Sequence, residues 1–203
     1  MGKGLLIVLS GPSGAGKGTV CKALLTRHPE VALSISCTTR SPRNNEKEGV
    51  NYFFKSEEEF KDLIRQDEFL EHACVYGNYY GTPKSFVAQK LEEGSDVMLE
   101  IDVQGALRAK KIFPDGILIF LVPPSMEELE RRIRGRGTES EEQIQTRLGK
   151  AKSEMEQVER YDYVIVNDHI ERVVDEIESI IEAEKLKVKR AKKEFEDMRR
   201  KNL

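Results

Sequence analysis

The sequence predicts an α/β protein, a three-layer sandwich in which helices cover both faces of a parallel central sheet. Short apolar runs alternate with stretches of helical periodicity along most of the 203 residues, which is typical of parallel sheets. The first run, residues 5–9, is apolar throughout and stops at a glycine cluster, as expected of a strand buried on both faces. A turn-rich, aromatic segment, residues 35–82, interrupts the alternation and predicts a small α+β insert.

Each element has its own local signal. Core strands are expected at 5–9, 31–36, 97–101, 116–122 and 163–166, where apolar residues cluster. Helices are expected at 20–27, from Ser125 to the glycines at 135 and 137, along the apolar stripe 144–158, and from 170 onward. Thr82 and Pro83 are typical of the N-cap and first position of another helix. Within the insert, strands are expected at 52–54 and 69–75, with a helix around 60–64.

Composition excludes several classes of function. Lys and Arg total 33 against 36 Asp and Glu, a net charge of −3, so the chain lacks the basic footprint of a nucleic-acid binder. The first apolar run is too short for a membrane span or a secretory core, which predicts a soluble cytoplasmic protein without a membrane partner. The three cysteines at 21, 37 and 74 have neither metal-ligand nor disulfide spacing, and we expect them to be buried.

A phosphate-binding loop follows the first strand. Residues 11–19 read Gly-Pro-Ser-Gly-Ala-Gly-Lys-Gly-Thr and lie between a buried strand and a helix, the context that a P-loop requires. Glycines let backbone amides converge on a polyphosphate, and the helix N-terminus adds positive potential. The loop therefore predicts a P-loop NTPase-type fold that binds ATP. The expected ATP-binding residues here are Gly11, Ser13, Gly14, Ala15, Gly16, Lys17, Gly18 and Thr19.

The loop departs from the general P-loop pattern at one position. Gly18 stands where a Ser or Thr normally reaches Mg²⁺, and Thr19 comes one residue later. We therefore expect Mg²⁺, the cofactor that accompanies ATP, to be held by phosphates and water rather than by a direct protein ligand. Glu100 follows a buried strand and is the candidate for a contact through water.

Several further segments occur in a fixed order that resembles the guanylate kinase family. They are residues 36–43 (Ser-Cys-Thr-Thr-Arg-Ser-Pro-Arg), 78–82 (Asn-Tyr-Tyr-Gly-Thr), 100–105 (Glu-Ile-Asp-Val-Gln-Gly), 134–138 (Arg-Gly-Arg-Gly-Thr) and 164–168 (Val-Ile-Val-Asn-Asp). With the P-loop they span the chain to about residue 185. Only the charged C-terminal extension lies outside the resemblance, and we expect it to be a solvated helix.

The resemblance implies three parts and a reaction. An ATP-binding core would comprise residues 1–34, 83–124 and 158–203, a GMP-binding domain 35–82, and a helical lid 125–157. The implied activity is direct in-line phosphoryl transfer from ATP to GMP without a covalent enzyme intermediate, giving ADP and GDP. It leaves open whether dGMP is also an acceptor, and whether the protein is a monomer or a homodimer.

The resemblance also implies how GMP would be held. Glu71 would accept hydrogen bonds from the two adjacent donors of guanine, and either Ser36 or Thr82 would donate to its O6. Asp102 would lie on the base side, or would only cap the helix that follows its strand; the sequence favours neither. The implied phosphate-binding residues are Arg40, Arg43, Tyr52 and Tyr80, with Glu46 orienting one of the arginines.

Catalysis would then depend on positive charge rather than on a general base. The acceptor is a phosphate oxygen that is already ionised at neutral pH, so no residue has to deprotonate it. The resemblance assigns the charge to Lys17 and to the lid arginines Arg132, Arg136 and Arg147. Arg132 and Arg136 would share a helix face if that helix continued through Gly135. Asn167 would lie near the ATP base or the lid.

Two other functions remain open from the sequence. Some domains that resemble this family bind phosphopeptides at the GMP site, but those usually have a degraded P-loop, which this chain does not. A kinase for another small phosphate, such as a ribose bisphosphate, would not need the guanine-reading residues.

Overall fold

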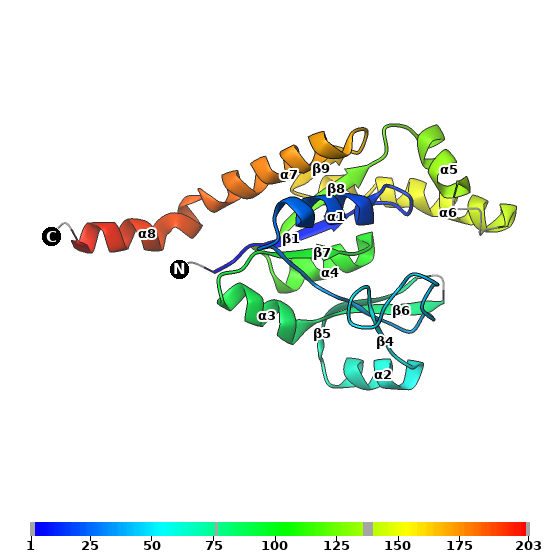
Figure 1. The fold of residues 1–203 in the computed structure, drawn as a ribbon, viewed down its shortest axis with the longest axis horizontal. Helices are drawn as coiled ribbons and strands as arrows, with labels where there is room; N and C mark the ends of the chain where they lie inside the picture. Colours follow the sequence, from blue (N-terminus) through cyan, green and yellow to red (C-terminus); the bar gives the residue numbers. More distant parts are fainter. Residues whose placement is uncertain (1–2, 76, 136–139, 202–203) are drawn as a thin grey trace.

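The protein has a five-stranded parallel sheet as its central layer (Figure 1). The computed structural model describes residues 3–75, 77–135 and 140–201. The strands are β1 (Leu6–Ser10), β2 (Ala32–Leu33), β7 (Val97–Glu100), β8 (Ile117–Val122) and β9 (Tyr163–Val166), and they lie in the order β2-β7-β1-β8-β9. All of their pairings are parallel, which confirms the predicted sheet.

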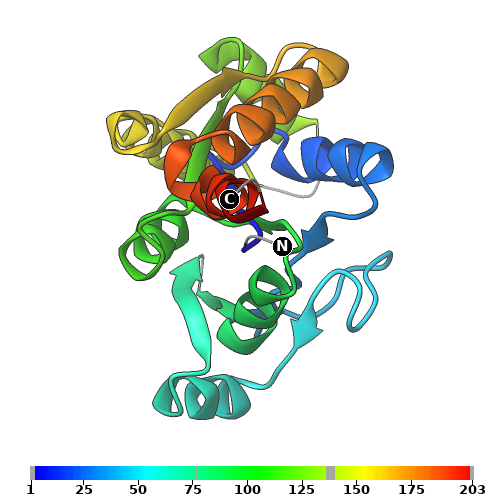
Figure 2. The same ribbon diagram turned by 90° about the vertical axis from the view of Figure 1, so that its left-hand side faces the viewer.

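Helices cover both faces because strand β1 sends alternate side chains to opposite sides. Leu5, Ile7 and Leu9 pack under α1 (Lys17–Arg27) and α7 (Ile170–Lys185). Leu6 and Val8 pack on the other face with α3 (Lys84–Glu92) and α4 (Val103–Ile112). Figures 1 and 2 show the two helix layers on either side of the sheet. This confirms the predicted three-layer sandwich.

The insert has its own sheet and its own small core. Its four strands, β3 (Cys37–Thr38), β4 (Phe53–Phe54), β5 (Phe69–Val75) and β6 (Asn78–Pro83), lie in the order β4-β3-β6-β5. Helix α2 (Glu57–Arg65) begins at a capping box formed by Ser56 and Glu59. Phe60, on this helix, stacks on Phe69 with ring centroids 4.5 Å apart. Strand β5 has the bounds that the sequence predicted.

The helices next to the P-loop form a hairpin of α5 (Met126–Arg134) and α6 (Glu141–Met155). Ser125 caps α5, as predicted. Helix α5 ends at Arg134 and does not continue through Gly135, the condition for a helix face shared by Arg132 and Arg136; Arg136 itself lies outside the described residues. Val158 is not part of α6 but begins a short 3-10 helix, Val158–Arg160.

Three other local expectations are wrong. Thr82 is not a helix cap, because β6 continues to Pro83, and Pro83 itself is the N-cap residue of α3. The strand expected at 31–36 is only Ala32–Leu33, because this edge strand pairs with β7 alone before the chain enters the insert. Cys21 and Cys37 are buried as expected, but Cys74 is exposed near the end of β5.

The C-terminal end of the chain is helical. Helix α8 (Val188–Lys201) follows α7 and extends away from the body of the molecule (Figure 1). Among the described residues, no helix is long and apolar enough to cross a membrane.

Candidate active site

The loop between β1 and α1 has a backbone that requires glycine. Gly11, Gly14 and Gly16 have φ angles of 144°, 92° and 96°, which L side chains rarely adopt. A Cβ atom at Gly11 would also lie 2.2 Å from the carbonyl oxygen of Leu121 on β8. Helix α1 begins at Lys17, directly after Gly16, so its N-terminus is part of the loop. This is the arrangement that lets backbone amides face a phosphate.

Lys17 lies at the floor of a cavity and faces its own loop. Its ammonium group donates hydrogen bonds to the carbonyl oxygens of Gly11, at 2.8 Å, and Pro12, at 3.2 Å. Burial lowers the pKa of Lys17, and the nearby carboxylates of Glu100 and Glu154 oppose this shift. The side chain is therefore partly removed from water, and a charge in such a place interacts with a phosphate more strongly than that of a surface lysine does.

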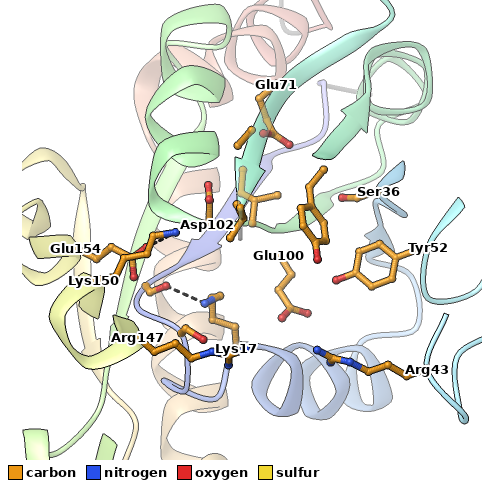
Figure 3. A pocket seen from close by; sticks show the side chains of 16 residues that line it. Lys17, Ser36, Arg43, Tyr52, Glu71, Glu100, Asp102, Arg147, Lys150 and Glu154 are labelled. Atoms are coloured by element: carbon orange, nitrogen blue, oxygen red, sulfur yellow. Dashed lines mark hydrogen bonds and ion pairs between the residues drawn. The ribbon is translucent and has the colours of Figure 1, made fainter. Parts of the chain in front are cut away.

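The cavity has a volume of about 240 Å³ and lies between the P-loop, the insert and α6 (Figure 3). Eleven of the predicted residues line it, although they come from segments far apart in the sequence. They are Gly11, Ser13, Lys17, Ser36, Arg43, Tyr52, Glu71, Tyr80, Glu100, Asp102 and Arg147. Figure 3 shows Glu71 at one end of the cavity, and Lys17 and Arg147 at the other.

Glu71 is a buried carboxylate with one defined partner in the insert. Its side chain accepts a 2.7 Å hydrogen bond from the hydroxyl of Thr82 on the neighbouring strand β6. The residue is only 5% exposed, and burial raises its pKa to about 7, against the lowering effect of the Thr82 bond. A Cβ atom at Gly105 would lie 2.6 Å from Glu71 Oε2, which is too close. Helix α4 can therefore pack against the Glu71 carboxylate only because residue 105 is glycine. Thr82 therefore holds Glu71 in place, and it does not itself line the cavity.

The two carboxylate oxygens of Asp102 have different surroundings, and one of them forms the predicted helix cap. Its Oδ1 accepts a 2.7 Å hydrogen bond from the amide of Gly105 and caps α4. Its Oδ2 is buried and has no hydrogen-bond partner, although the residue lines the cavity. A buried acceptor without a partner is costly, and a donor from a bound molecule would remove that cost.

The predicted phosphate-binding residues of the insert divide into two groups. Arg43, Tyr52 and Tyr80 line the cavity, whereas Arg40 does not. Arg40 makes a two-pronged ion pair with Glu46, at 2.8 and 2.9 Å, and lies over the ring of Tyr52. Glu46 also accepts a hydrogen bond from the backbone amide of Arg43. The carboxylate therefore fixes both arginine positions.

Arg132 and Asn167 lie behind the P-loop, outside the cavity lining. The amide nitrogen of Asn167 donates to the carbonyl oxygen of Ala15 at 2.7 Å. The guanidinium of Arg132 donates to the same oxygen at 3.3 Å, to the Asn167 carbonyl at 3.0 Å and to Glu128 at 2.7 Å. Both residues thus brace the loop through its backbone.

The surroundings of Gly18 fit a metal held through water. A Cβ atom at Gly18 would lie 3.3 Å from Glu100 Oε1, so this carboxylate occupies space beside the position where other P-loops carry a hydroxyl. Glu100 is reached by solvent through the cavity, yet protein surrounds it on most sides and raises its pKa, against the lowering effect of Lys17. Carboxylate oxygen is a ligand type that hydrated Mg²⁺ accepts.

Two charged residues of the cavity wall were missed by the sequence analysis. Lys150 and Glu154 on α6 both line it, and their charged atoms are 3.6 Å apart. One signal was available, because Lys150 follows Arg147 by three residues and the two therefore share a helix face. On a charged helix that spacing alone does not distinguish a site residue from a solvated one.

Comparisons with known proteins show which proteins this chain is similar to. A family model described as guanylate kinase matches residues 3–184. A guanylate kinase of Caldanaerobacter subterraneus subsp. tengcongensis is 60% identical over 190 residues, covering 94% of this chain and 92% of the relative. A guanylate kinase of Clostridium perfringens strain 13 is 57% identical, covering 94% and 88%. The crystal structure of guanylate kinase from Anaplasma phagocytophilum superposes with a TM-score of 0.80 at 39% identity, covering 94% and 90%.

Proposed function

Because this chain belongs to the guanylate kinase family, we propose that it transfers the γ-phosphoryl group of ATP directly to GMP, giving ADP and GDP. One observation carries the proposal. A buried carboxylate, Glu71, stands at one end of a single cavity, and the P-loop lysine, Lys17, stands at the other. One residue suited to recognise guanine and one suited to bind a triphosphate thus line the same cavity. This arrangement suits the transfer of a phosphoryl group between two nucleotides.

Guanine would bind at the Glu71 end. Its N1–H and 2-amino group are adjacent donors, and the ionised carboxylate of Glu71 can accept from both. Donation from the base would also favour the charged form of Glu71, whose pKa of about 7 leaves much of it protonated at neutral pH without that contact. Asp102 Oδ2 has acceptor capacity for a further donor, and Ser36 offers a hydroxyl for O6. Adenine presents an acceptor at N1, so it would face the Glu71 carboxylate with a lone pair.

The GMP phosphate would bind between Arg43, Tyr52 and Tyr80. A guanidinium holds two phosphate oxygens at once, and each tyrosine hydroxyl can donate to another. Arg40 would contribute its charge from behind, because its donors are already directed to Glu46. Arg43, and not Arg40, would therefore donate hydrogen bonds directly to the oxygens of the GMP phosphate.

ATP would bind with its phosphates against the P-loop. The loop amides and the N-terminus of α1 supply donors that need no movement, and Lys17 can give its ammonium donors to phosphate oxygens in place of the Gly11 and Pro12 carbonyls. Ser13 lines the same wall. Asn167 and Arg132 would support the loop rather than grip the transferred group.

Glu100, through water, would hold Mg²⁺ beside the ATP phosphates. The ion, when bound, neutralises phosphate charge and orients the oxygens for transfer. Glu100 is the carboxylate next to Gly18, where no side-chain hydroxyl is available. The remaining positive charge would come from Lys17 and Arg147 in the cavity; Arg136 stays a prediction of the sequence.

The attacking atom is an oxygen of the GMP phosphate, so this chain has no proton to remove before transfer. Its residues would instead hold the two phosphates in line and keep water away from the transferred group. Hydrolysis of ATP is the competing reaction, which is why the hairpin of α5 and α6 would act as a lid over the cavity. A cytoplasmic location and the oligomeric state also stay predictions.

An acceptor panel tests the proposal. ADP release would be measured with ATP, Mg²⁺ and one acceptor at a time: GMP, dGMP, AMP, a ribose bisphosphate or none. We expect turnover with GMP to exceed that with AMP by at least about 10³, because a carboxylate that reads guanine leaves adenine unpaired. Equal use of GMP and the ribose bisphosphate would contradict guanine reading. Binding of GMP with no ADP formation would indicate a binding module instead.

A further inference from the structure

We propose that Lys150 is a further phosphate-binding residue of the reaction, and that Glu154 is the positioning residue that directs its ammonium group into the cavity. The inference rests on the proposed function, because it assigns a contact to the phosphoryl group that moves between ATP and GMP. It names a charge that neither the P-loop pattern nor the lid arginines include.

The first support is position. Lys150 lies three residues after Arg147 on α6, so both side chains leave the same face of the helix and both line the cavity. Figure 3 shows Lys150 with Glu154 on the wall beside Asp102, opposite the wall that carries Tyr52. A group between these walls would be reached from α6 by two cations, not by one.

The second support is how the other cations of the hairpin are used. Arg131 pairs with Glu128, and Arg134 pairs with Glu130 and Glu141, on the exposed side. Arg132 is directed to the P-loop backbone, as described above. Among the described residues of the hairpin, the cations that line the cavity are Arg147 and Lys150.

The third support is that the contact between Lys150 and Glu154 is poorly suited to a purely structural role. The two residues are four apart with the lysine first, which is the weaker orientation for a helix ion pair. Their charged atoms are 3.6 Å apart, longer than a direct hydrogen bond. The Glu154 side chain is only 12% exposed, so the pair keeps a carboxylate largely out of water. A partner on the solvent side of the helix would avoid that desolvation.

The arrangement makes sense when phosphates are present. An ammonium group has three donors, so Lys150 can keep its contact with Glu154 and still donate to a phosphate oxygen. Glu154 lies within electrostatic range of both Lys17 and Asp102, so the pair stands between the P-loop and the base side of the cavity, where a phosphate group of either nucleotide would pass. Because charge on the transferring group spreads over its outer oxygens in the transition state, a second cation from α6 would stabilise that state.

The test compares Lys150→Met with Lys152→Met, a change two residues away on the same helix at an exposed position outside the cavity. Steady-state kinetics would be measured for both substrates, with melting temperatures as a check of folding. We expect Lys150→Met to lose about 10–100-fold in kcat/KM for GMP, with a loss in kcat; this is less than the roughly 10²–10³ for a single preorganised donor, because Arg147 stays on the same face. Lys152→Met should stay within about twofold. Lys150→Arg should recover most of the loss, because it restores the charge.

Glu154→Gln separates positioning from structure. It should lower kcat/KM for GMP by a smaller factor than Lys150→Met does, and adding it to Lys150→Met should cost little more, because both changes remove one contact. Normal kinetics in Lys150→Met, or a loss confined to the KM of ATP, would overturn this inference alone. If the unaltered protein formed no ADP with GMP, the proposed function would fall as well.

Discussion

The two ends of the cavity, the loop end at Lys17 and the guanine end at Glu71, differ in whether their binding groups belong to the backbone or to side chains. At the loop end the backbone amides of the P-loop bind beside the Lys17 side chain, and three glycines with positive φ set the direction of those amides. At the guanine end they belong to side chains that come from separate segments: Glu71 on β5 is held by Thr82, eleven residues later on β6, and Asp102 lies at the start of α4, where the Gly105 amide holds it. A backbone site can therefore be recognised from one short segment, whereas a side-chain site exists only after the chain has folded.

Substitutions at the two ends should therefore have different effects on activity. A change at the guanine end removes discrimination between bases and leaves the phosphate machinery in place. A change at the loop end removes turnover with every acceptor and leaves recognition of GMP in place. The predictions below test this contrast, from the largest expected effect to the smallest.

Glu71→Ala should have the largest effect. Guanine would lose the acceptor for two donors, and kcat/KM for GMP should fall on the order of 10³ to 10⁴, whereas the affinity for an ATP analogue should change little. Steady-state kinetics and calorimetric titration measure the two quantities. Glu68→Ala, at an exposed position just before β5, is the matched control and should behave like the unaltered protein. Equal losses for GMP and ATP would show that Glu71 does not read the base.

Lys17→Ala should act at the other end. Turnover should fall by about 10² to 10³, because the loop loses its desolvated cation at the transferring phosphate. Binding of GMP alone, followed by calorimetry, should stay within a few fold. Lys22→Ala, on the exposed side of α1, controls for the loss of a positive charge on the same helix. Turnover that survives in Lys17→Ala would contradict the role of the loop.

The features that could be predicted from the sequence follow the same division. The sheet, strands 69–75 and 163–166, and the P-loop depend on apolar runs and glycines within a few residues, so local patterns were sufficient. Thr82 was misassigned as a helix cap, because a Thr-Pro pair suits a strand end equally well when the hydroxyl has a partner on the next strand. That partner, Glu71, is eleven residues away, and no local pattern reveals it.

The residues proposed to recognise guanine were predicted only from the resemblance to a family. Lys150 and Glu154 on α6 were not predicted at all. A lysine and a glutamate four apart on a charged helix are normally solvated. Only the tertiary structure shows that this face of α6 forms a cavity wall. The residues alone could thus predict the P-loop, but not which side chains from distant segments line the cavity beside it.

Thr82→Val should produce an intermediate effect at the guanine end. Valine keeps the shape of the side chain but removes the hydroxyl that donates to Glu71. We expect kcat/KM for GMP to fall about tenfold, as for the loss of one hydrogen bond to a charged group. The pKa of Glu71 should rise further, so the loss should be smaller at pH 8.5 than at pH 6.5. A loss that is the same at both pH values would indicate a defect in folding rather than in the state of Glu71.

The last prediction concerns stability rather than activity. Replacing Glu71 should lower activity with GMP, but it should raise stability relative to the unaltered protein as the pH rises. The pKa of Glu71 is about 7 in the folded protein, above the ordinary value of 4.5, so the folded state binds more protons between these two values. Stability from this group is therefore fully present below about pH 4.5 and is lost as the pH rises through 7. Glu71→Gln removes the ionisation, so its melting temperature relative to the unaltered protein should rise by about 5–10 °C between pH 5 and pH 8. Glu68→Gln should show no such trend. If Glu71→Gln showed none either, the carboxylate would not be desolvated, and its selectivity for guanine would need another source.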